Sequence, residues 1–252
     1  MEILLKDIMP NPFRREKEYP YDPAKIERFV NSINENLFWQ NIIARKSPNN
    51  NGKFEIAYGH HRIKALKKLK YKSIDIPIFD LDDNQMLKIM AEENHDDYKM
   101  SPAALNETIK AVRDYLNKQV KGETWEVFRT GTEHLFDTEH GFKIAQGKGV
   151  GEDTIKRFLG KNWSKSQIEQ SIAMINAEEK DDFDIEVAEK MPTTKAARSF
   201  QKAAKTYKVP KKKQREIAKK LPKDVSSREV EKAIRKEKKT RRFLFNLIIR
   251  FL

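Results

Sequence analysis

The chain has 252 residues, of which 35% are charged and 38% hydrophobic, and its formal net charge is +13. This length suggests one large domain or two ordinary ones. The absence of Cys excludes disulfides, a thiolate nucleophile and Cys-ligated zinc, and it fits a reducing cytoplasm. The longest apolar cluster, residues 243–249, is far shorter than the ~20 residues that span a bilayer, and no secretory signal opens the sequence. We therefore expect a cytoplasmic protein without a transmembrane segment.

Positive charge is concentrated near the end of the sequence. Residues 1–100 sum to +1 and residues 101–200 to −2, whereas residues 201–252 sum to +14. Such an asymmetry favours a polyanionic partner, either nucleic acid or an acidic membrane surface. A solvated Lys-rich helix face gives the same composition without a partner, so charge alone leaves both interpretations open.

The first hundred residues alternate between strand-like and helix-like patterns. Asp22 suits the N-cap of a helix and Pro23 suits its first position. Apolar residues recur at helical spacing over residues 26–33. The predicted strands cover 1–8, 41–46, 54–58 and 74–81, with the strand at 54–58 paired to the one at 41–46. The other predicted helices cover 60–70 and 82–93. We expect a small mixed α/β domain over residues 1–100.

Strand patterns disappear after residue 100. The sequence predicts a helical domain over 101–210 and a basic helical extension over 211–252 that ends in an apolar tail. The fold class is therefore α+β, with the mixed domain followed by an all-α one. The tail at 243–252 is too apolar to leave exposed in water, so it either pairs with another copy of the chain or lies on a membrane surface. We favour self-association and expect a homodimer.

A glycine stands where the strand at 54–58 gives way to a helix. Gly59 is followed by His60, His61 and Arg62. Amides at a helix N-terminus favour anions, and glycine lets a phosphate approach the backbone closely. Arg62 can add a bidentate contact, and the two His residues can add hydrogen-bond donors or acid–base groups. Ordinary turn chemistry is the more frequent explanation of a glycine at such a junction.

An acidic cluster ends the next predicted helix. Residues 92–97 read Glu-Glu-Asn-His-Asp-Asp. Carboxylates beside an amide oxygen suit Mg²⁺, which usually brings phosphates with it. The alternative is a solvated acidic helix end, although carboxylates at a helix C-terminus oppose the helix dipole.

The order of these segments resembles the ParB partition-protein family. The family's Gln-Pro-Ile, Gly-Glu-Arg-Arg-x-Arg-Ala and Glu-Asn-x-Gln-Arg motifs correspond here to Gln40-Asn41-Ile42, Gly59-His60-His61-Arg62-Ile63-Lys64-Ala65 and Glu93-Asn94-His95-Asp96-Asp97. The correspondence keeps register over residues 1–107. It implies a ParB/sulfiredoxin fold that binds CTP and Mg²⁺ and closes as a dimeric clamp on DNA.

The resemblance also assigns roles by position. The residues that it places against the nucleotide are Gln40, Gly59, His60, His61, Arg62 and Asn94, and those that it places on the metal are Glu93 and Asn94. His60-His61 replaces the family's Glu-Arg, which removes a catalytic carboxylate and phosphate-neutralising charge. The resemblance thus implies weak CTP hydrolysis at most.

An enzymatic alternative stays open. The His-His version also resembles the Gly-His-His-Arg element of archaeal free-serine kinases on the same fold. A metal-dependent nuclease or a nucleotide-dependent phosphotransferase is therefore the competing hypothesis, with His60 and His61 as its candidate catalytic residues.

Residues 142–159 have the spacing of a helix-turn-helix. Ala145 allows two helices to cross closely, and Gly149 permits the tight turn. Val150, Ile155 and Phe158 would fill the angle between the helices. The predicted DNA-contacting residues are Lys148, Thr154, Lys156, Arg157 and Lys161, most of them on a second helix that begins near Glu152. An ordinary helical hairpin is the alternative.

The ParB resemblance supports the DNA-binding interpretation. The family carries a helix-turn-helix here, and the resemblance continues through residues 191–198, where Lys195 stands for a family His, and 225–231. It implies double-stranded DNA as partner, a role in partition or regulation of plasmid, chromosome or phage DNA, and a nucleoid- or plasmid-associated location. A ParA-type ATPase is a less expected partner, because the first predicted strand leaves no basic arm before it.

Overall fold

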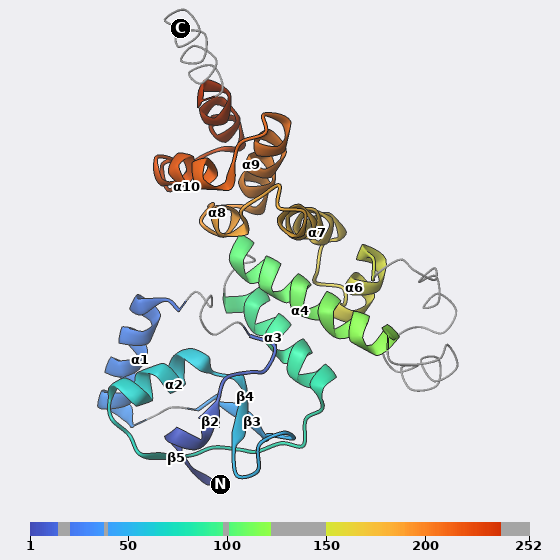
Figure 1. Ribbon diagram of the computed structural model, residues 1–252. Helices are drawn as coiled ribbons and strands as arrows, with labels where there is room; N and C mark the ends of the chain where they lie inside the picture. The colour runs from blue at the N-terminus through green and yellow to red at the C-terminus, as the bar shows by residue number, and fades with distance from the viewer. Residues whose placement is uncertain (15–20, 38–39, 98–100, 122–149, 238–252) are drawn as a thin grey trace, which may run out of the picture. The chain divides into compact units, whose positions relative to one another are not determined.

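The computed structural model describes residues 1–14, 21–37, 40–97, 101–121 and 150–237, and the chain divides into two compact units, Met1–Lys99 and Met100–Leu252. Within the described residues, the first unit mixes strands and helices and the second is helical (Figure 1). The predicted α+β fold class is confirmed. In the described part of the chain no helix is both long and apolar enough to cross a membrane.

Among the described residues of the first unit, five short strands form two sheets. They are β1 (Glu2–Leu4), β2 (Ile8–Met9), β3 (Ile43–Lys46), β4 (Phe54–Tyr58) and β5 (Ser73–Asp75). β4 is the central strand of one sheet, parallel to β2 and antiparallel to β3, and β1 pairs antiparallel with β5 in the other. The predicted pairing of the segments at 41–46 and 54–58 is confirmed.

Two strand predictions were too long. A 3₁₀ turn over Leu5–Asp7 splits the segment predicted as one strand at 1–8. The strand predicted over 74–81 ends at Asp75, and only an isolated bridge between Ala44 and Ile78 follows. Pro77 has no backbone N–H to donate to a neighbouring strand, so a regular ladder cannot continue through it.

The helices of the first unit are α1 (Pro23–Asn36), α2 (His60–Lys68) and α3 (Asp83–Asp97). The Asp22 carboxylate accepts a hydrogen bond from the Ala24 amide at 2.9 Å, which confirms the predicted N-cap. Helices α1 and α2 pack side by side, and α3 contacts β4 (Figure 1). Their buried residues, such as Ile33 and Leu66, join those of the strands in one core.

The second unit contains α4 (Pro102–Lys121), α6 (Glu152–Leu159), α7 (Lys165–Glu179), α8 (Ile185–Glu189), α9 (Thr194–Thr206) and α10 (Lys211–Lys219), and residues 227–237 are also helical (Figure 1). The Phe183 and Phe200 rings lie 6.3 Å apart in its core. Ile217 and Ile234 belong to the same core cluster. The basic segment that follows residue 210 is therefore part of this packed unit up to residue 234.

Candidate functional site

The turn between β4 and α2 requires glycine. Gly59 has φ +102°, in the left-handed region. A Cβ at this position would lie 3.0 Å from the Asn41 carbonyl oxygen and 3.0 Å from Cγ1 of Ile42. The segment before β3 therefore packs directly against the start of α2. No side chain caps this helix N-terminus, which is the arrangement that lets backbone amides meet an anion.

The two histidines that open α2 are buried and anchor neighbouring segments. His60 Nε2 accepts a hydrogen bond from the Asn11 amide at 3.2 Å, and His61 Nε2 accepts one from the Asp22 amide at 3.1 Å. The Tyr21 ring meets the His61 ring edge-on, with centroids 5.4 Å apart. Each Nε2 is thus an acceptor within the protein. A catalytic role for either histidine stays a prediction.

Glu93 of α3 lies at the centre of a buried polar cluster. Its carboxylate forms an ion pair with Arg14, lies 3.3 Å from Nδ1 of His60 and accepts a hydrogen bond from the Gly59 amide at 3.4 Å. The Asn94 Oδ1 accepts a hydrogen bond from Arg14 at 2.9 Å. The two residues predicted to bind a metal are therefore brought together, and the same guanidinium holds both.

The charge of this cluster follows from its contacts. Burial alone would raise the pKa of Glu93, but the hydrogen bond to His60 and the positive charge of Arg14 lower it to about 2. Sequence reasoning missed Arg14. A signal was available, because an acidic residue on an otherwise apolar helix face needs a buried cation.

Nothing in the described residues forms a ready metal site. Among them, no group of three His, Asp or Glu side chains is arranged to hold an ion. Glu93 and Asn94 offer oxygen donors suited to Mg²⁺, but Arg14 engages both. The side chains of Asp96 and Asp97 lie outside the described residues, and the Mg²⁺ prediction is untested.

Two cationic side chains near the start of α2 lie on aromatic rings. The Arg62 guanidinium is 4.4 Å from the centroid of the Phe29 ring on α1, and the Lys64 ammonium is 4.6 Å from that of Tyr21. These cation–π contacts hold both charges near the start of α2. Arg62 is half-buried, so its position is better defined than that of a fully solvated side chain.

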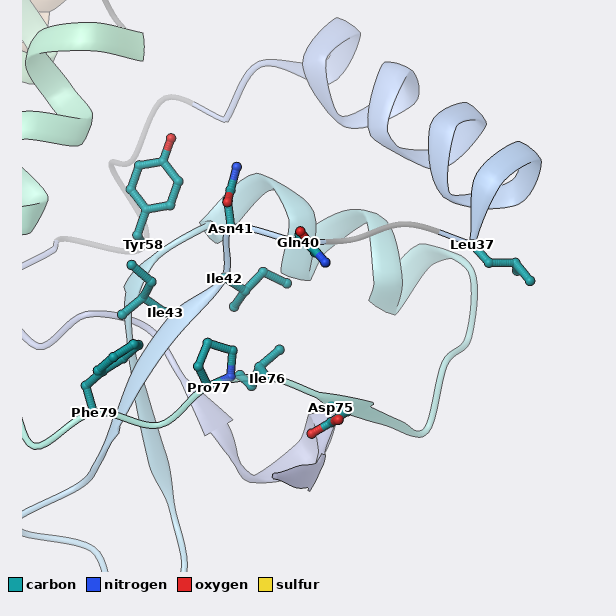
Figure 2. Close-up of a pocket in the computed structure, with 10 residues that line it drawn as sticks. All are labelled: Leu37, Gln40, Asn41, Ile42, Ile43, Tyr58, Asp75, Ile76, Pro77 and Phe79. Atoms are coloured by element: carbon teal, nitrogen blue, oxygen red, sulfur yellow. The ribbon is translucent and has the colours of Figure 1, made fainter.

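A pocket of about 830 Å³ adjoins the glycine turn. It is lined by Leu37, Gln40, Asn41, Ile42, Ile43, Tyr58, Asp75, Ile76, Pro77 and Phe79. Figure 2 shows the amide side chains of Gln40 and Asn41 on one side of the apolar residues and the Asp75 carboxylate on the other. Because Asn41 and Ile42 also abut Gly59, the pocket shares a wall with the start of α2. Its size and mostly apolar lining are typical of small-ligand sites.

The second predicted helix of the helix-turn-helix is present as α6. Val150, Ile155 and Phe158 are buried as predicted. Residues 142–149, including Lys148, lie outside the described residues, so the helix-turn-helix itself stays a prediction.

The predicted DNA-contacting side chains of α6 differ in their surroundings. Arg157 and Lys161 are exposed, and Thr154 is half-buried. The Lys156 ammonium instead donates a hydrogen bond to the Trp163 carbonyl oxygen, which ties α6 to the following turn. Of the predicted set, Arg157 is the charged side chain of α6 that is exposed to solvent.

Comparison with known proteins associates the first unit with one family. A family model of the ParB N-terminal domain matches residues 1–95. The chain is 32% identical over 108 residues to a probable chromosome-partitioning protein ParB of Campylobacter jejuni, and 24% identical over 110 residues to one of Helicobacter pylori. These matches cover 43% and 44% of this chain but only 37% and 36% of the relatives.

Two solved structures align with most of the chain at low similarity. Both are of the C-terminally truncated chromosome-partitioning protein ParB from Caulobacter crescentus. The one complexed to the centromeric parS site is 19% identical, with 94% of this chain and 99% of that chain covered and a TM-score of 0.42. The one complexed with CTP-gamma-S is 16% identical, with 91% and 97% covered and a TM-score of 0.34.

Proposed function

We propose that the chain, whose residues 1–95 match the ParB N-terminal domain, is a ParB-like DNA-binding protein that acts in DNA partition or regulation and responds to CTP. The observation that carries the proposal is this domain match, in a chain whose second unit is helical and exposes Arg157 on α6. Double-stranded DNA is the proposed partner, and the nucleoid is the proposed location.

The glycine turn and the adjoining pocket support nucleotide binding. The uncapped start of α2 and the Arg62 guanidinium suit phosphates. The apolar pocket walls suit a base, and the exposed Gln40 amide can hydrogen-bond to it. Because the pocket and the helix start share a wall at Gly59, one ligand can reach both.

Mg²⁺ does not fit Glu93 and Asn94 as they stand. Arg14 holds the oxygens of both residues, and a cation there would meet a buried guanidinium. We therefore derive no step through the ion. A hydrolytic role for His60 and His61 gains no support, because each Nε2 already accepts a backbone hydrogen bond.

Helix α6 supports the DNA-binding part of the proposal. Its apolar face is anchored by Ile155 and Phe158, which leaves Arg157 exposed on a rigid element. Arg is the residue that most often reads guanine in a major groove, and Lys161 is suited to a backbone phosphate. A dimer and a ParA-type ATPase as further partners rest on the resemblance alone.

The DNA-binding proposal is tested with a duplex selected from a random library by the full chain. Arg157→Ala is expected to weaken binding to that duplex by about 1–3 kcal/mol, roughly 5- to 150-fold, and to weaken an unrelated duplex less. Arg28→Ala, which removes an exposed Arg from α1, is the matched control. Lys156 is a poorer choice, since its loss also removes the bond to Trp163. If no duplex is selected, or if Arg157→Ala binds as the wild type does, this part of the proposal fails.

A further inference from the structure

A second pocket, with a volume of about 370 Å³, lies between the C-terminal end of α7 and one face of α9. We call it the α7–α9 groove. It is lined by Ala173, Asn176, Ala177, Lys180, Asp182, Arg198, Gln201, Lys202, Lys205 and Thr206. Four of these residues are cationic and one is acidic. Helices α7 and α9 pack against each other within the second unit (Figure 1).

Arg198 is the best-defined cation of the groove. It is half-buried, and its guanidinium donates a hydrogen bond to Oε1 of the buried Gln201. Burial lowers the pKa of Arg198, and no carboxylate contributes an opposing effect. A partly desolvated guanidinium that is held in place without an anionic neighbour is a cation prepared for an external anion.

The surrounding lysines add uncompensated charge. Arg198, Lys202 and Lys205 follow at i, i+4 and i+7, so they lie along one face of α9. Lys180 joins them from the end of α7. Within the residues that the structure describes, none of these four cations has an ion-pair partner, and the three lysines are exposed.

The neighbouring helix α10 shows the opposite arrangement. Lys211 pairs with Asp181 at 2.6 Å, Lys213 pairs with Glu216 at 2.8 Å, and Arg215 pairs with Asp184. Basic residues of this unit are therefore often neutralised by its own carboxylates. The cations of the α7–α9 groove are not neutralised in this way, although the exposed Asp182 lines the same groove.

We propose that the α7–α9 groove binds a phosphate group of a DNA backbone, with the Arg198 guanidinium as its main ligand. This inference rests on the proposed function and deepens it. A guanidinium fork can bind two oxygens of a phosphate, and the exposed lysines suit a phosphodiester on a duplex outside the groove. Such a contact adds affinity that is independent of sequence and sensitive to salt.

The test measures duplex affinity of the full chain over a series of salt concentrations. Arg198→Gln is expected to weaken the selected duplex and an unrelated duplex by the same factor. It should also reduce the magnitude of the slope of log affinity against log salt by about 0.9, the value for one lost phosphate contact. Arg198→Lys keeps the charge and should retain the wild-type slope, whereas Asp182→Asn should raise affinity for both duplexes.

The controls separate this inference from the proposed function. Lys232→Ala removes an exposed Lys outside the groove and should leave the slope unchanged. If Arg198→Gln keeps its thermal midpoint and also the wild-type slope, the inference is overturned while DNA binding stands. A wild-type chain that binds no duplex overturns the proposed function instead.

Inorganic phosphate in solution presents the same anionic oxygens to the groove as a phosphate of the DNA backbone. At constant ionic strength, inorganic phosphate in the millimolar range is expected not to displace the duplex from the wild type. Inorganic phosphate could instead displace the duplex from the wild type but not from Arg198→Gln, while Arg198→Gln keeps the wild-type salt slope. That result would assign the groove to a free phosphate and contradict the DNA assignment.

Discussion

At the scale of single residues, the Glu93 carboxylate joins three segments of the first unit. It contacts Arg14 from the loop after β2, His60 at the start of α2 and the backbone of Gly59. Charges in such an interior are tolerated only when they are paired and hydrogen-bonded. The cluster therefore fixes the glycine turn against α3, and its loss should be felt by the whole unit.

The pKa of Glu93 predicts a pH-dependent stability. Its folded-state pKa is about 2, below the ordinary value of 4.5. Its contribution to the free energy of unfolding is therefore complete above about pH 4.5 and is lost as the pH falls toward 2. The shift corresponds to about 3 kcal/mol. Glu93→Gln should lower the free energy of unfolding by about 3–5 kcal/mol at pH 7, because the buried Arg14 loses its ion pair with this carboxylate, and by clearly less at pH 3.

Urea unfolding that is read through hydrogen exchange of the β4 amides measures this effect in the full chain. Glu92→Gln, at the exposed neighbouring position on α3, is the control and should change little at either pH. If Glu93→Gln lowers the free energy of unfolding equally at pH 7 and pH 3, the ion pair is not what stabilises the turn.

At the scale of elements, the junction between β4 and α2 predicts a difference between two glycines. Gly59→Ala combines a left-handed φ with contacts of 3.0 Å to Asn41 and Ile42, whereas Gly52→Ala at φ +76° meets nothing within 4 Å. Gly52→Ala should therefore lower the free energy of unfolding by about 1 kcal/mol, through backbone strain alone. Gly59→Ala should lower it by about 1–3 kcal/mol more, because the new Cβ also meets its neighbours. Thermal midpoints of the two variants test this, and equal midpoints would contradict the packing described at the turn.

Sequence patterns predicted those elements whose signals are local. The cap at Asp22, the pairing of β3 with β4 and the buried face of α6 all follow from neighbouring residues. The strand expected over 74–81 failed because the apolar pattern continues through Pro77, which cannot pair.

The candidate site was predicted in its members but not in its contacts. His60, Glu93 and Gly59 were each singled out, yet the pairing of Glu93 with Arg14 depends on residues far apart in the sequence. The hydrogen bond of Lys156 to the Trp163 carbonyl oxygen, and the lack of a carboxylate beside Arg198 in the described part of the chain, likewise depend on the tertiary structure. Side-chain partners of this kind are set by packing, which no single-sequence periodicity encodes.

At the scale of the whole molecule, a unit that matches the ParB N-terminal domain over residues 1–95 is followed by a helical unit that is rich in basic residues. The central claim is that the first unit binds a nucleotide and the second binds DNA. Nucleotide binding is the property to establish first, because it belongs to the unit whose residues match the ParB N-terminal domain.

Calorimetric titration of the full chain with CTP, ATP and GTP, each with Mg²⁺, tests that claim most directly. We predict binding of CTP in preference to ATP and GTP, and its loss in Arg62→Ala but not in Lys67→Ala, an exposed charge on the same helix. Folded protein that binds none of the three nucleotides would contradict the account.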